Sequence, residues 1–510
     1  MSTKLLTTAA IGLDSELIEI EADSTFAQLP MTLIVGLPDK AITEAKERVR
    51  SAIKNSGAEF PSRHRLTISL APADLKKEGP AYDLPIAVSI LLDSNQINLP
   101  DGWDKQIFIG ELALDGALRP VTGVISSAML AKRKGIKKIY LPQANAAEAN
   151  LIPGLEIYPV ANLNQLINHF QNLEPIKPFI SEINYEQFIE NIPGEADFSQ
   201  IKGQENVKRA LEIAAAGGHN ILMSGPPGAG KNMLAKAVVS ILPKMTMDES
   251  LEVTRIYSVA GLLSKEKPLI TARPYRSPHH TASGAALVGG GAWPKPGEIS
   301  LAHRGILFLD ELPEFPRVVL EYLRQPLEDG IINVSRASGT MQFPAKFTLI
   351  AAMNPCPCGY ATDDSRRCTC GQSQIIKYQK KISGPLLDRI DLHIEVPKVK
   401  FDKLTSDTPS ESSEKIRVRI QTARNLQAAR FKNTKIITNS EMSVSQIKEF
   451  CKIDSVALDL LRNAISQMHL SARAYHRVLK LARTIADLAG AEAMVSDHIA
   501  EALQYRPKVE

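Results

Sequence analysis

Residues 225–232 read GPPGAGKN, and their types and spacing suit the binding of a nucleoside triphosphate. An apolar stretch, Ile221 to Met223, precedes them, and a helical pattern follows. Glycines let backbone N–H groups turn toward phosphates, a helix N-terminus adds partial positive charge, and a lysine reaches the outer phosphates. We therefore predict an ATP-binding loop (P-loop) made of Gly225, Pro226, Pro227, Gly228, Ala229, Gly230, Lys231 and Asn232.

The last loop position departs from the usual pattern. It is normally Ser or Thr, whose hydroxyl binds Mg²⁺, and here it is Asn232. An amide oxygen can ligate a hard cation, but it sits on a longer side chain. We expect ATP binding to be kept, and the rate of hydrolysis to depend on how well Asn232 serves as a ligand for Mg²⁺.

A second segment, GILFLDE at residues 305–311, supplies carboxylates. Its apolar run predicts a buried strand, and the carboxyl ends of strands in open α/β sheets are where ligands bind. Asp310 is predicted to hold Mg²⁺, directly or through water, and Glu311 to orient and polarise the attacking water. The alternative is a buried strand with an ordinary acidic turn.

Four of the five cysteines lie close together, as Cys356-Pro-Cys358 and Cys368-Thr-Cys370. Thiolates from two short turns can surround a tetrahedral Zn²⁺, which would fold a loop of low apolar content. The spacing is C-x-C rather than the commoner C-x₂-C, so four reduced cysteines in a loop are the alternative.

The 510 residues suggest about three domains. Breaks rich in Pro, Gly or Ser predict a domain at 1–175, a linker at 176–193, a central domain at 194–402, a polar linker at 403–413 and a helical domain at 414–510. Alternating strands and helices in the central domain predict an α/β fold with a parallel sheet.

The net charge of +4 permits a nucleic-acid partner without arguing for one. The chain shows no secretory signal pattern and no apolar run of about 18 residues that would span a membrane. We therefore expect a cytoplasmic protein without a membrane partner.

The motif order as a whole resembles a known class. The P-loop, ILFLDE, FTLIAAMNP, SGPLLDRID and LSARAYHRVLKLARTIADL are similar to the AAA+ class that holds the magnesium-chelatase ATPase subunit and the MCM helicases. RPYRSPHHTASGAALVGGGAWPKPGEISLAHRGILFLDELPEF resembles the ComM/YifB family most closely. That resemblance implies an ATPase with ATP and Mg²⁺, a helical C-terminal lid and a homo-hexameric ring.

The same resemblance implies a DNA helicase that promotes branch migration in natural transformation and homologous recombination. Its partners would be single-stranded and branched DNA and recombination proteins. By position, Asn354 matches sensor 1, Arg389 the arginine finger that enters the neighbouring subunit's site, and Arg473 sensor 2, with Arg477 as a substitute. An added guanidinium stabilises the charge that develops on the γ-phosphate. The alternative for Arg389 is a surface salt bridge.

Residues 331–349 predict a β-hairpin, which in the resembling helicases points into the pore of the ring. Arg336 and Lys346 would there contact DNA phosphates, the alternative being solvated side chains. The insert at 273–298 contains His279 and His280, which we expect to be structural or to contact DNA or a neighbouring subunit.

The N-terminal domain resembles the Lon-type protease domain in EGPAYDLPIAVSIL and IGELALDGALRPVTGV. The catalytic Ser and Lys positions of that family fall on Ala81 and Ile125, so we predict an α+β domain without proteolytic activity. The basic run at 132–138 is either a DNA contact or a solvated helix face.

Two other functions stay open from the sequence. The first is a magnesium-chelatase-type motor subunit that remodels a protein partner. The second is an ATP-regulated scaffold that does not hydrolyse ATP, for which Asn232 is the motivating residue.

Overall fold

The computed structural model describes residues 3–36, 40–75, 77, 79–98, 105–181, 196–264, 266–291, 294–336, 339–363, 365–399, 410–468 and 470–506. The chain forms two compact units. One comprises Met1–Phe188 with Ser250–Ile270, and the other Ile189–Glu249 with Thr271–Glu510.

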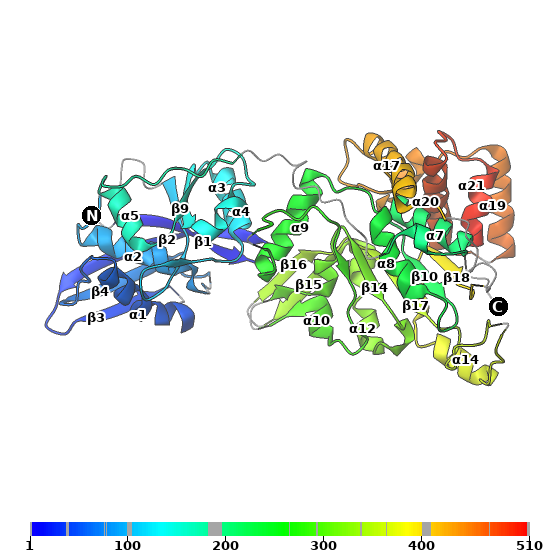
Figure 1. Ribbon diagram of the computed structural model, residues 1–510, viewed down its shortest axis with the longest axis horizontal. Coiled ribbons are helices and arrows are strands. Elements are labelled where there is room, and N and C mark those ends of the chain that lie inside the picture. The colour runs from blue at the N-terminus through cyan, green and yellow to red at the C-terminus, as the bar shows by residue number, and fades with distance from the viewer. Residues whose placement is uncertain are drawn as a thin grey trace. The chain divides into compact units, whose positions relative to one another are not determined.

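The first unit is built on a seven-stranded mixed sheet in the order β3-β4-β2-β1-β5-β8-β9 (Figure 1). Along β2, Ile18, Ile20 and Ala22 are buried on one face while acidic residues alternate with them. This period of two makes the sheet one-sided, and the helices cover its apolar face. The elements are β1 (Thr3–Ile11), β2 (Asp14–Phe26), β3 (Met31–Val35), α1 (Lys40–Asn55), β4 (His64–Ala71), η1 (Pro80–Tyr82), α2 (Asp83–Asp93), β5 (Gln106–Phe108), β6 (Glu111–Leu112), β7 (Leu118–Arg119), α3 (Val124–Lys134), β8 (Lys138–Pro142), η3 (Gln143–Asn145), α4 (Ala146–Ala149), β9 (Glu156–Val160) and α5 (Leu163–Phe170).

The segment Ser250–Ile270 belongs to this first unit, although in sequence it falls within the central domain predicted at 194–402. Most of it is the helix α9 (Met247–Ala260). Ser258 Oγ donates to Glu148 Oε1 at 2.5 Å and accepts from the Gly123 N–H at 3.0 Å. Arg255 donates to the Leu13 carbonyl at 2.9 Å. Such long-range polar contacts leave no local sequence signal.

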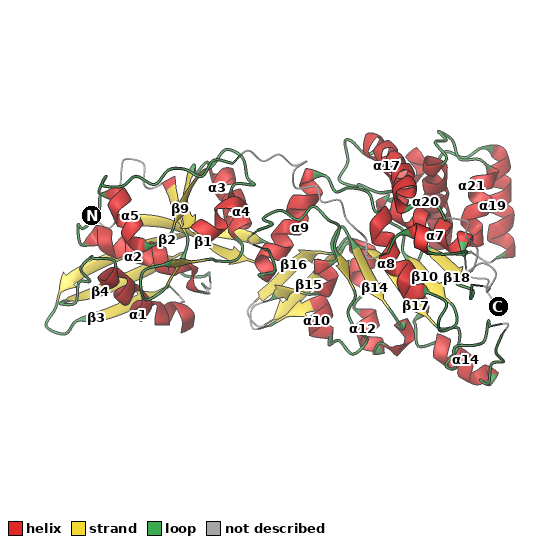
Figure 2. Cartoon of the chain, viewed as in Figure 1, coloured by secondary structure: helices red, strands yellow, loops and turns green. Residues whose placement is uncertain are grey.

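The second unit contains a five-stranded parallel sheet in the order β11-β14-β17-β10-β18. All four residues of β14 are buried because both faces of this sheet are covered. Figure 2 shows its strands beside α7 and α8. The elements up to the sheet's last strand are η4 (Phe198–Gln200), α7 (Glu205–Gly217), β10 (Ile221–Ser224), α8 (Lys231–Ile241), β11 (Tyr275–Arg276), α10 (Gly284–Val288), β12 (Gly289–Gly290), β13 (Lys295–Pro296), α11 (Glu298–Leu301), β14 (Ile306–Leu309), η5 (Leu312–Glu314), α12 (Arg317–Glu321), α13 (Arg324–Asp329), β15 (Ile331–Arg336), β16 (Gly339–Pro344), β17 (Thr348–Met353), α14 (Gln372–Gln379), α15 (Gly384–Leu387) and β18 (Leu392–Glu395).

Helices complete the second unit and share one apolar core with its sheet. Val478, Leu481 and Ile485 of α20 pack in the same buried cluster as α7, α8 and β10. The strong apolar stripe of α20 explains its place at the centre of this packing. These elements are α17 (Ser413–Arg430), η6 (Asn439–Glu441), α18 (Val444–Phe450), α19 (Ser455–Gln467), α20 (Ala472–Leu488) and α21 (Ser496–Gln504). Within the described ranges, no helix combines the length and apolar character that crossing a bilayer requires.

Candidate nucleotide site

Three neighbouring strands place the predicted site residues at one edge of the five-stranded sheet. The P-loop follows β10, the Asp310-Glu311 pair follows β14, and Asn354 follows β17. The strands are parallel and adjacent in the order β14-β17-β10. Their carboxyl ends therefore lie together at one edge, which is the position expected for a ligand site in an open α/β sheet.

The P-loop turns from β10 into α8, whose first residue is Lys231. Gly228 and Gly230 have positive φ angles of 77° and 85°, which non-glycine residues seldom adopt. A Cβ atom on Gly225 would lie 2.2 Å from the Val396 carbonyl oxygen. The loop glycines are thus required by its backbone path, and the N-terminus of α8 opens toward the loop.

Lys231 is buried within the loop. Its Nζ donates to the carbonyl oxygens of Gly225 at 2.6 Å and Pro226 at 3.0 Å, and to Asn354 Oδ1 at 3.1 Å. Burial lowers the pKa of Lys231, while Asp310 and Glu311 act in the opposite direction. The geometry therefore brings together residues that the sequence identified in three separate segments.

The acidic pair has a constrained backbone. Glu311 has a positive φ of 51°, and its N–H donates to Asp310 Oδ1 at 2.9 Å. A left-handed conformation is costly for a non-glycine residue, and such strain gathers at functional sites. It turns the chain sharply after β14.

His280 lies against Glu311, with Nδ1 at 3.4 Å from Glu311 Oε2. The imidazole also contacts the His279 ring at 4.1 Å between centroids and the Phe315 ring at 6.3 Å. The sequence did not assign His280 to this site, because no residue spacing connects the insert to β14. The available signal was the His-His pair within an unusually long insert.

Asn232 is exposed in the first turn of α8. That Asn232 binds Mg²⁺ together with Asp310 stays a prediction.

Arg389 and Arg473 lie at the other edge of the sheet. Arg389 precedes β18, whose Leu392 pairs with Ile221 at the amino end of β10. Arg389 is buried, forms an ion pair with Glu328 and donates to the Pro385 carbonyl at 2.6 Å. Arg473 approaches the same Glu328 at 3.7 Å. The predicted arginine finger and the predicted sensor 2 arginine thus share the carboxylate of Glu328.

Arg477, the substitute for Arg473, has a different partner. It contacts Asp391 Oδ1 at 2.6 Å, and His219 Nδ1 lies 3.3 Å from Asp391 Oδ2. Burial opposes ionisation of Asp391, but Arg477 and His219 outweigh it and lower its pKa. Arg477 is therefore engaged in a buried pair, whereas the Arg473 side chain is 67% exposed.

The four clustered cysteines converge, with all four sulfur atoms within 4.8 Å of one another. Cys356 Sγ lies 3.4 Å from Cys358 Sγ and 3.7 Å from Cys368 Sγ, and Cys358 Sγ lies 3.6 Å from Cys368 Sγ. Backbone N–H groups of Thr369 and Tyr360 lower the pKa of Cys358 to about 5. This arrangement is compatible with a zinc ion.

The predicted hairpin is present as β15 and β16, which pair from Ile331 with Pro344 to Arg336 with Gly339. The side chain of Arg336 and the residues at the tip lie outside the described part of the chain. Lys346 follows the hairpin, and its Nζ contacts Glu441 Oε2 at 2.5 Å. The DNA contacts of both residues stay predictions, and that of Lys346 would compete with this ion pair.

In the first unit, Ala81 lies in η1 and Ile125 is buried in the first turn of α3. The Ile125 N–H donates to Glu148 Oε1 at 3.0 Å. Neither residue supplies a hydroxyl or an amine. The basic residues Lys132 to Lys134 are exposed in the last turn of α3.

The parallel sheet, the P-loop after β10 and the acidic pair after β14 define the AAA+ class of P-loop proteins. Three family descriptions match: magnesium chelatase subunit ChlI at 197–404, subunit ChlI of Mg-chelatase at 20–145, and the ChlI C-terminal segment at 410–506. The chain is 44% identical over 508 residues to the competence protein ComM of Haemophilus influenzae, which covers 98% of this chain and 96% of that one. It belongs to the ComM/YifB family of magnesium-chelatase-like AAA+ proteins.

Two further relatives extend this result. YifB of Escherichia coli is 43% identical over 504 residues, with 98% of this chain and 96% of that one covered. The Lon protease of Rhizobium meliloti is 29% identical over 164 residues, which is 30% of this chain and 20% of that one. The likeness to Lon is therefore partial.

Proposed function

We propose that this protein is an ATP-hydrolysing, ring-forming DNA motor that promotes branch migration during natural transformation and homologous recombination. The observation that carries this proposal is the division of the catalytic set between two edges of one sheet. Lys231, Glu311 and Asn354 lie at the carboxyl edge, and Arg389 and Arg473 lie at the amino edge.

The site fits ATP and Mg²⁺ by its donor set. The P-loop combines positive-φ glycines, a close backbone approach at Gly225 and the N-terminus of an eleven-residue helix. Lys231 would bind the outer phosphates, and Asp310 with Asn232 would hold Mg²⁺. ATP supplies a phosphoryl group whose transfer to water drives the motor.

Each residue of the carboxyl edge has a distinct task in hydrolysis. Glu311 orients the attacking water and accepts its proton, which general bases do best within hydrogen-bond reach. Asn354 lies beside Lys231 and helps to place that water near the phosphates. Lys231 neutralises charge on the phosphate oxygens.

The position of Arg389 and Arg473 at the amino edge of the sheet requires a second subunit if they are to reach a nucleotide. β10 has four residues, and at about 3.3 Å per residue the strand separates the two edges by about 13 Å. Arg389 and Arg473 would therefore serve the nucleotide of a neighbouring subunit. A head-to-tail contact of this kind closes into a ring when its rotation allows. The number six rests on the family resemblance.

The DNA part of the proposal is supported by the hairpin β15–β16 and by the competence protein among the relatives. Arg336 and Lys346 would contact phosphates in the pore, and α17–α21 would act as the lid. The Lon-like unit would lack proteolysis because Ala81 and Ile125 replace the catalytic pair.

We also assign the cysteine cluster to zinc. A tetrahedral site with Zn–S bonds of about 2.3 Å has S–S edges of about 3.8 Å. The described S–S distances of 3.4, 3.7 and 3.6 Å approach that value. The metal would hold the loop between β17 and α14.

A second candidate function is a magnesium-chelatase-type motor subunit that remodels a protein partner. It is favoured by the match of ChlI descriptions to three parts of the chain. A third, the ATP-regulated scaffold, is favoured by Asn232 in the loop.

ATP hydrolysis with and without single-stranded DNA, together with branch migration on a four-way junction, separates these functions. The proposal expects DNA-stimulated hydrolysis and ATP-dependent migration, both absent in Lys231→Ala. Hydrolysis without any DNA effect would favour the chelatase-type motor. ATP binding without hydrolysis would favour the scaffold.

A further inference from the structure

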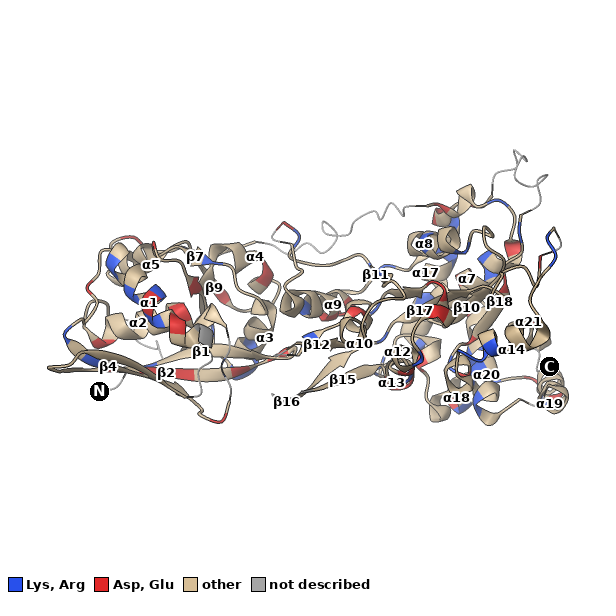
Figure 3. Ribbon diagram, turned by 90° about the horizontal axis from the view of Figure 1, so that it is seen from below, with Lys and Arg blue, Asp and Glu red and all other residues tan. Residues whose placement is uncertain are grey.

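Glu328 connects two parts of the proposed machinery in the second unit. It lies in the last turn of α13, where only Asp329 and Gly330 separate it from β15, the first strand of the hairpin. Gly330 has a positive φ of 67°, which lets the chain turn directly from the helix into the strand. In Figure 3, α13 lies between β15 and α20. A displacement of the hairpin would therefore reach Glu328 over a very short connection.

The base of the hairpin is packed tightly against the end of α13. The Gly330 carbonyl accepts a hydrogen bond from the Ala345 N–H at 2.8 Å. A Cβ atom on Gly330 would lie 2.8 Å from Lys346 Cγ. Ile332 of β15 and Phe343 of β16 pair with each other, and both are buried. Because this base is close-packed, we expect α13 and the hairpin to move as one body.

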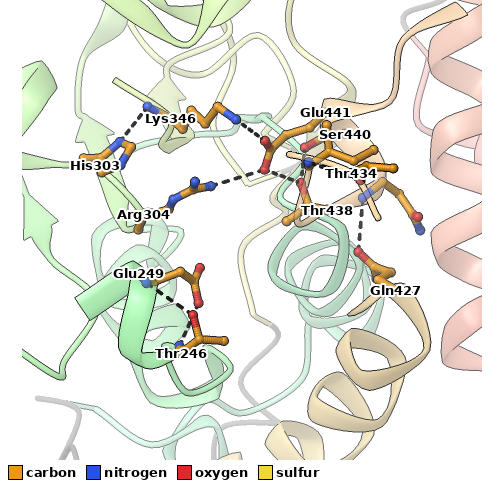
Figure 4. A network of polar contacts seen from close by, with 12 residues as sticks. Thr246, Glu249, His303, Arg304, Lys346, Gln427, Thr434, Thr438, Ser440 and Glu441 are labelled. Atoms are coloured by element: carbon orange, nitrogen blue, oxygen red, sulfur yellow. Dashed lines mark hydrogen bonds and ion pairs between the residues drawn. The ribbon is translucent and has the colours of Figure 1, made fainter. Parts of the chain in front are cut away.

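The other end of the hairpin is attached to the helical region. Lys346 Nζ contacts Glu441 of η6 at 2.5 Å, and the Lys346 N–H donates to His303 Nδ1 at 3.0 Å, as Figure 4 shows. Arg304 contacts the same Glu441 carboxylate at 3.4 Å. The hairpin is thus linked on one side to η6 and on the other, through Glu328, to the arginines at the amino edge of the sheet.

Glu328 directs Arg389 into its own subunit. Nη2 of Arg389 donates to Glu328 Oε2, and Nη1 donates to the Pro385 carbonyl at 2.6 Å. Only 8% of the Arg389 side chain is exposed. The hydrogen bond from Arg389, together with the nearby Arg473, lowers the pKa of Glu328, so this carboxylate is ionised at neutral pH. A guanidinium held in this way cannot present the same N–H groups to a phosphate in the neighbouring subunit.

The ion pair between Glu328 and Arg389 can nonetheless be exchanged. The Glu328 side chain is 50% exposed, and an ion pair in contact with water is weak. Glu328 and Arg473 also line a cavity of about 600 Å³, which leaves space for the carboxylate to move. A phosphate accepts from a guanidinium in the same paired geometry as a carboxylate does. Arg389 therefore has two competing acceptors, one in its own subunit and one in the neighbour.

We propose that Glu328 is a positioning residue that holds Arg389 within its own subunit and releases it to the neighbouring nucleotide when DNA binds the hairpin. This inference rests on the proposed function, in which Arg389 is the finger and β15–β16 contacts DNA. Binding of DNA displaces the hairpin together with α13, and the Glu328 carboxylate moves away from Arg389. The guanidinium is then free to neutralise charge on the γ-phosphate. Glu328 thus makes ATP hydrolysis depend on DNA.

The test measures kcat and KM for ATP in the full chain, with and without single-stranded DNA. Glu328→Gln keeps the shape of the side chain but removes its charge, and Glu328→Asp keeps the charge. Asp329→Asn is the matched control, because Asp329 is exposed on the same turn of α13 and no ion pair involves it within the described residues. The double variant Glu328→Gln/Arg389→Ala shows whether an effect acts through Arg389. DNA affinity and Tm are measured for each variant.

We expect Glu328→Gln to raise kcat without DNA by about two- to fivefold, the size set by a half-exposed ion pair, and to reduce the stimulation by DNA accordingly. KM, DNA affinity and Tm should stay near the parent values. Glu328→Asp should behave more like the parent than Glu328→Gln does, and the control should match the parent. The double variant should be as inactive as Arg389→Ala.

An unchanged or lower DNA-free kcat in Glu328→Gln, beside normal DNA stimulation of the parent, would overturn the role of Glu328 and leave the proposed function intact. A gain that persists in the double variant would also overturn it, because the effect would not act through Arg389. A parent protein without DNA-stimulated hydrolysis would contradict the proposed function itself, and the role of Glu328 with it.

Discussion

The contact between His280 and Glu311 is the feature of the site that most needs a residue-level test. Glu311 has a strained backbone, and its side chain is 52% exposed. His280 approaches its carboxylate at 3.4 Å. A base in so open a position needs a neighbour that fixes its direction.

We predict that His280→Ala lowers kcat for ATP about tenfold with little change in KM, which corresponds to about 1.4 kcal/mol. His280→Gln, which keeps a polar contact, should recover part of the rate. His279→Ala serves as the control. Steady-state ATPase assays measure all three, and an unchanged kcat in His280→Ala would remove this residue from the mechanism.

Asn232 is the second residue-scale question. A threonine hydroxyl is the usual Mg²⁺ ligand at this position. We expect Asn232→Thr to raise the rate of hydrolysis, with the larger effect at low Mg²⁺ concentration. ATPase rates of the parent protein and of Asn232→Thr, measured over a range of Mg²⁺ concentrations, test this expectation. A slower Thr variant would mean that the site is adapted to the amide.

At the scale of elements, local patterns predicted most of the secondary structure near the site. The helical pattern expected after the P-loop occurs as α8, and the hairpin expected at 331–349 occurs as β15 and β16. Such patterns depend only on residues that are close together in the sequence. The P-loop and acidic strand were found for the same reason.

Contacts between distant segments were not predictable in this way. His280 with Glu311, Lys346 with Glu441 and Ser258 with Glu148 each join residues far apart in sequence. Neither spacing nor composition encodes such pairs in a single sequence. The placement of 250–270 with the first unit has the same origin.

The hairpin β15–β16 carries the test of DNA binding. Arg336→Ala should keep basal ATP hydrolysis while weakening DNA binding and abolishing DNA stimulation. Each phosphate contact that is lost reduces by one the number of counterions released on binding. The salt dependence of DNA affinity should therefore flatten.

The measurements are DNA affinity at several salt concentrations and ATPase with and without DNA. Arg462→Ala, an exposed arginine on α19, is the matched control. Normal affinity with an unchanged salt slope in Arg336→Ala would shift attention to the basic run at 132–138.

The cysteine loop gives a prediction about metal content. We expect about one zinc per chain, lost when Cys356 and Cys358 are both replaced by serine. Cys451→Ala is the control, because that buried thiol lies outside the cluster. Elemental analysis of freshly reduced protein that finds no zinc would contradict the assignment.

At the scale of the whole molecule, the proposed function requires one active site to be shared by two chains. Lys231 and Arg389 occupy opposite edges of the same sheet. Sequence motifs identified both residues, but only the order and direction of the strands show that they face apart.

The most direct test mixes two inactive variants. The Lys231→Ala variant lacks the P-loop lysine, and the Arg389→Ala variant lacks the proposed arginine finger. Each variant by itself should lose ATPase activity. In mixed rings, some sites pair an intact loop with an intact finger from the neighbour. Equal, random mixing makes about a quarter of the interfaces complete. We predict that ATPase activity returns to about that fraction after subunit exchange. No recovery in rings shown to be mixed would contradict a site shared between subunits.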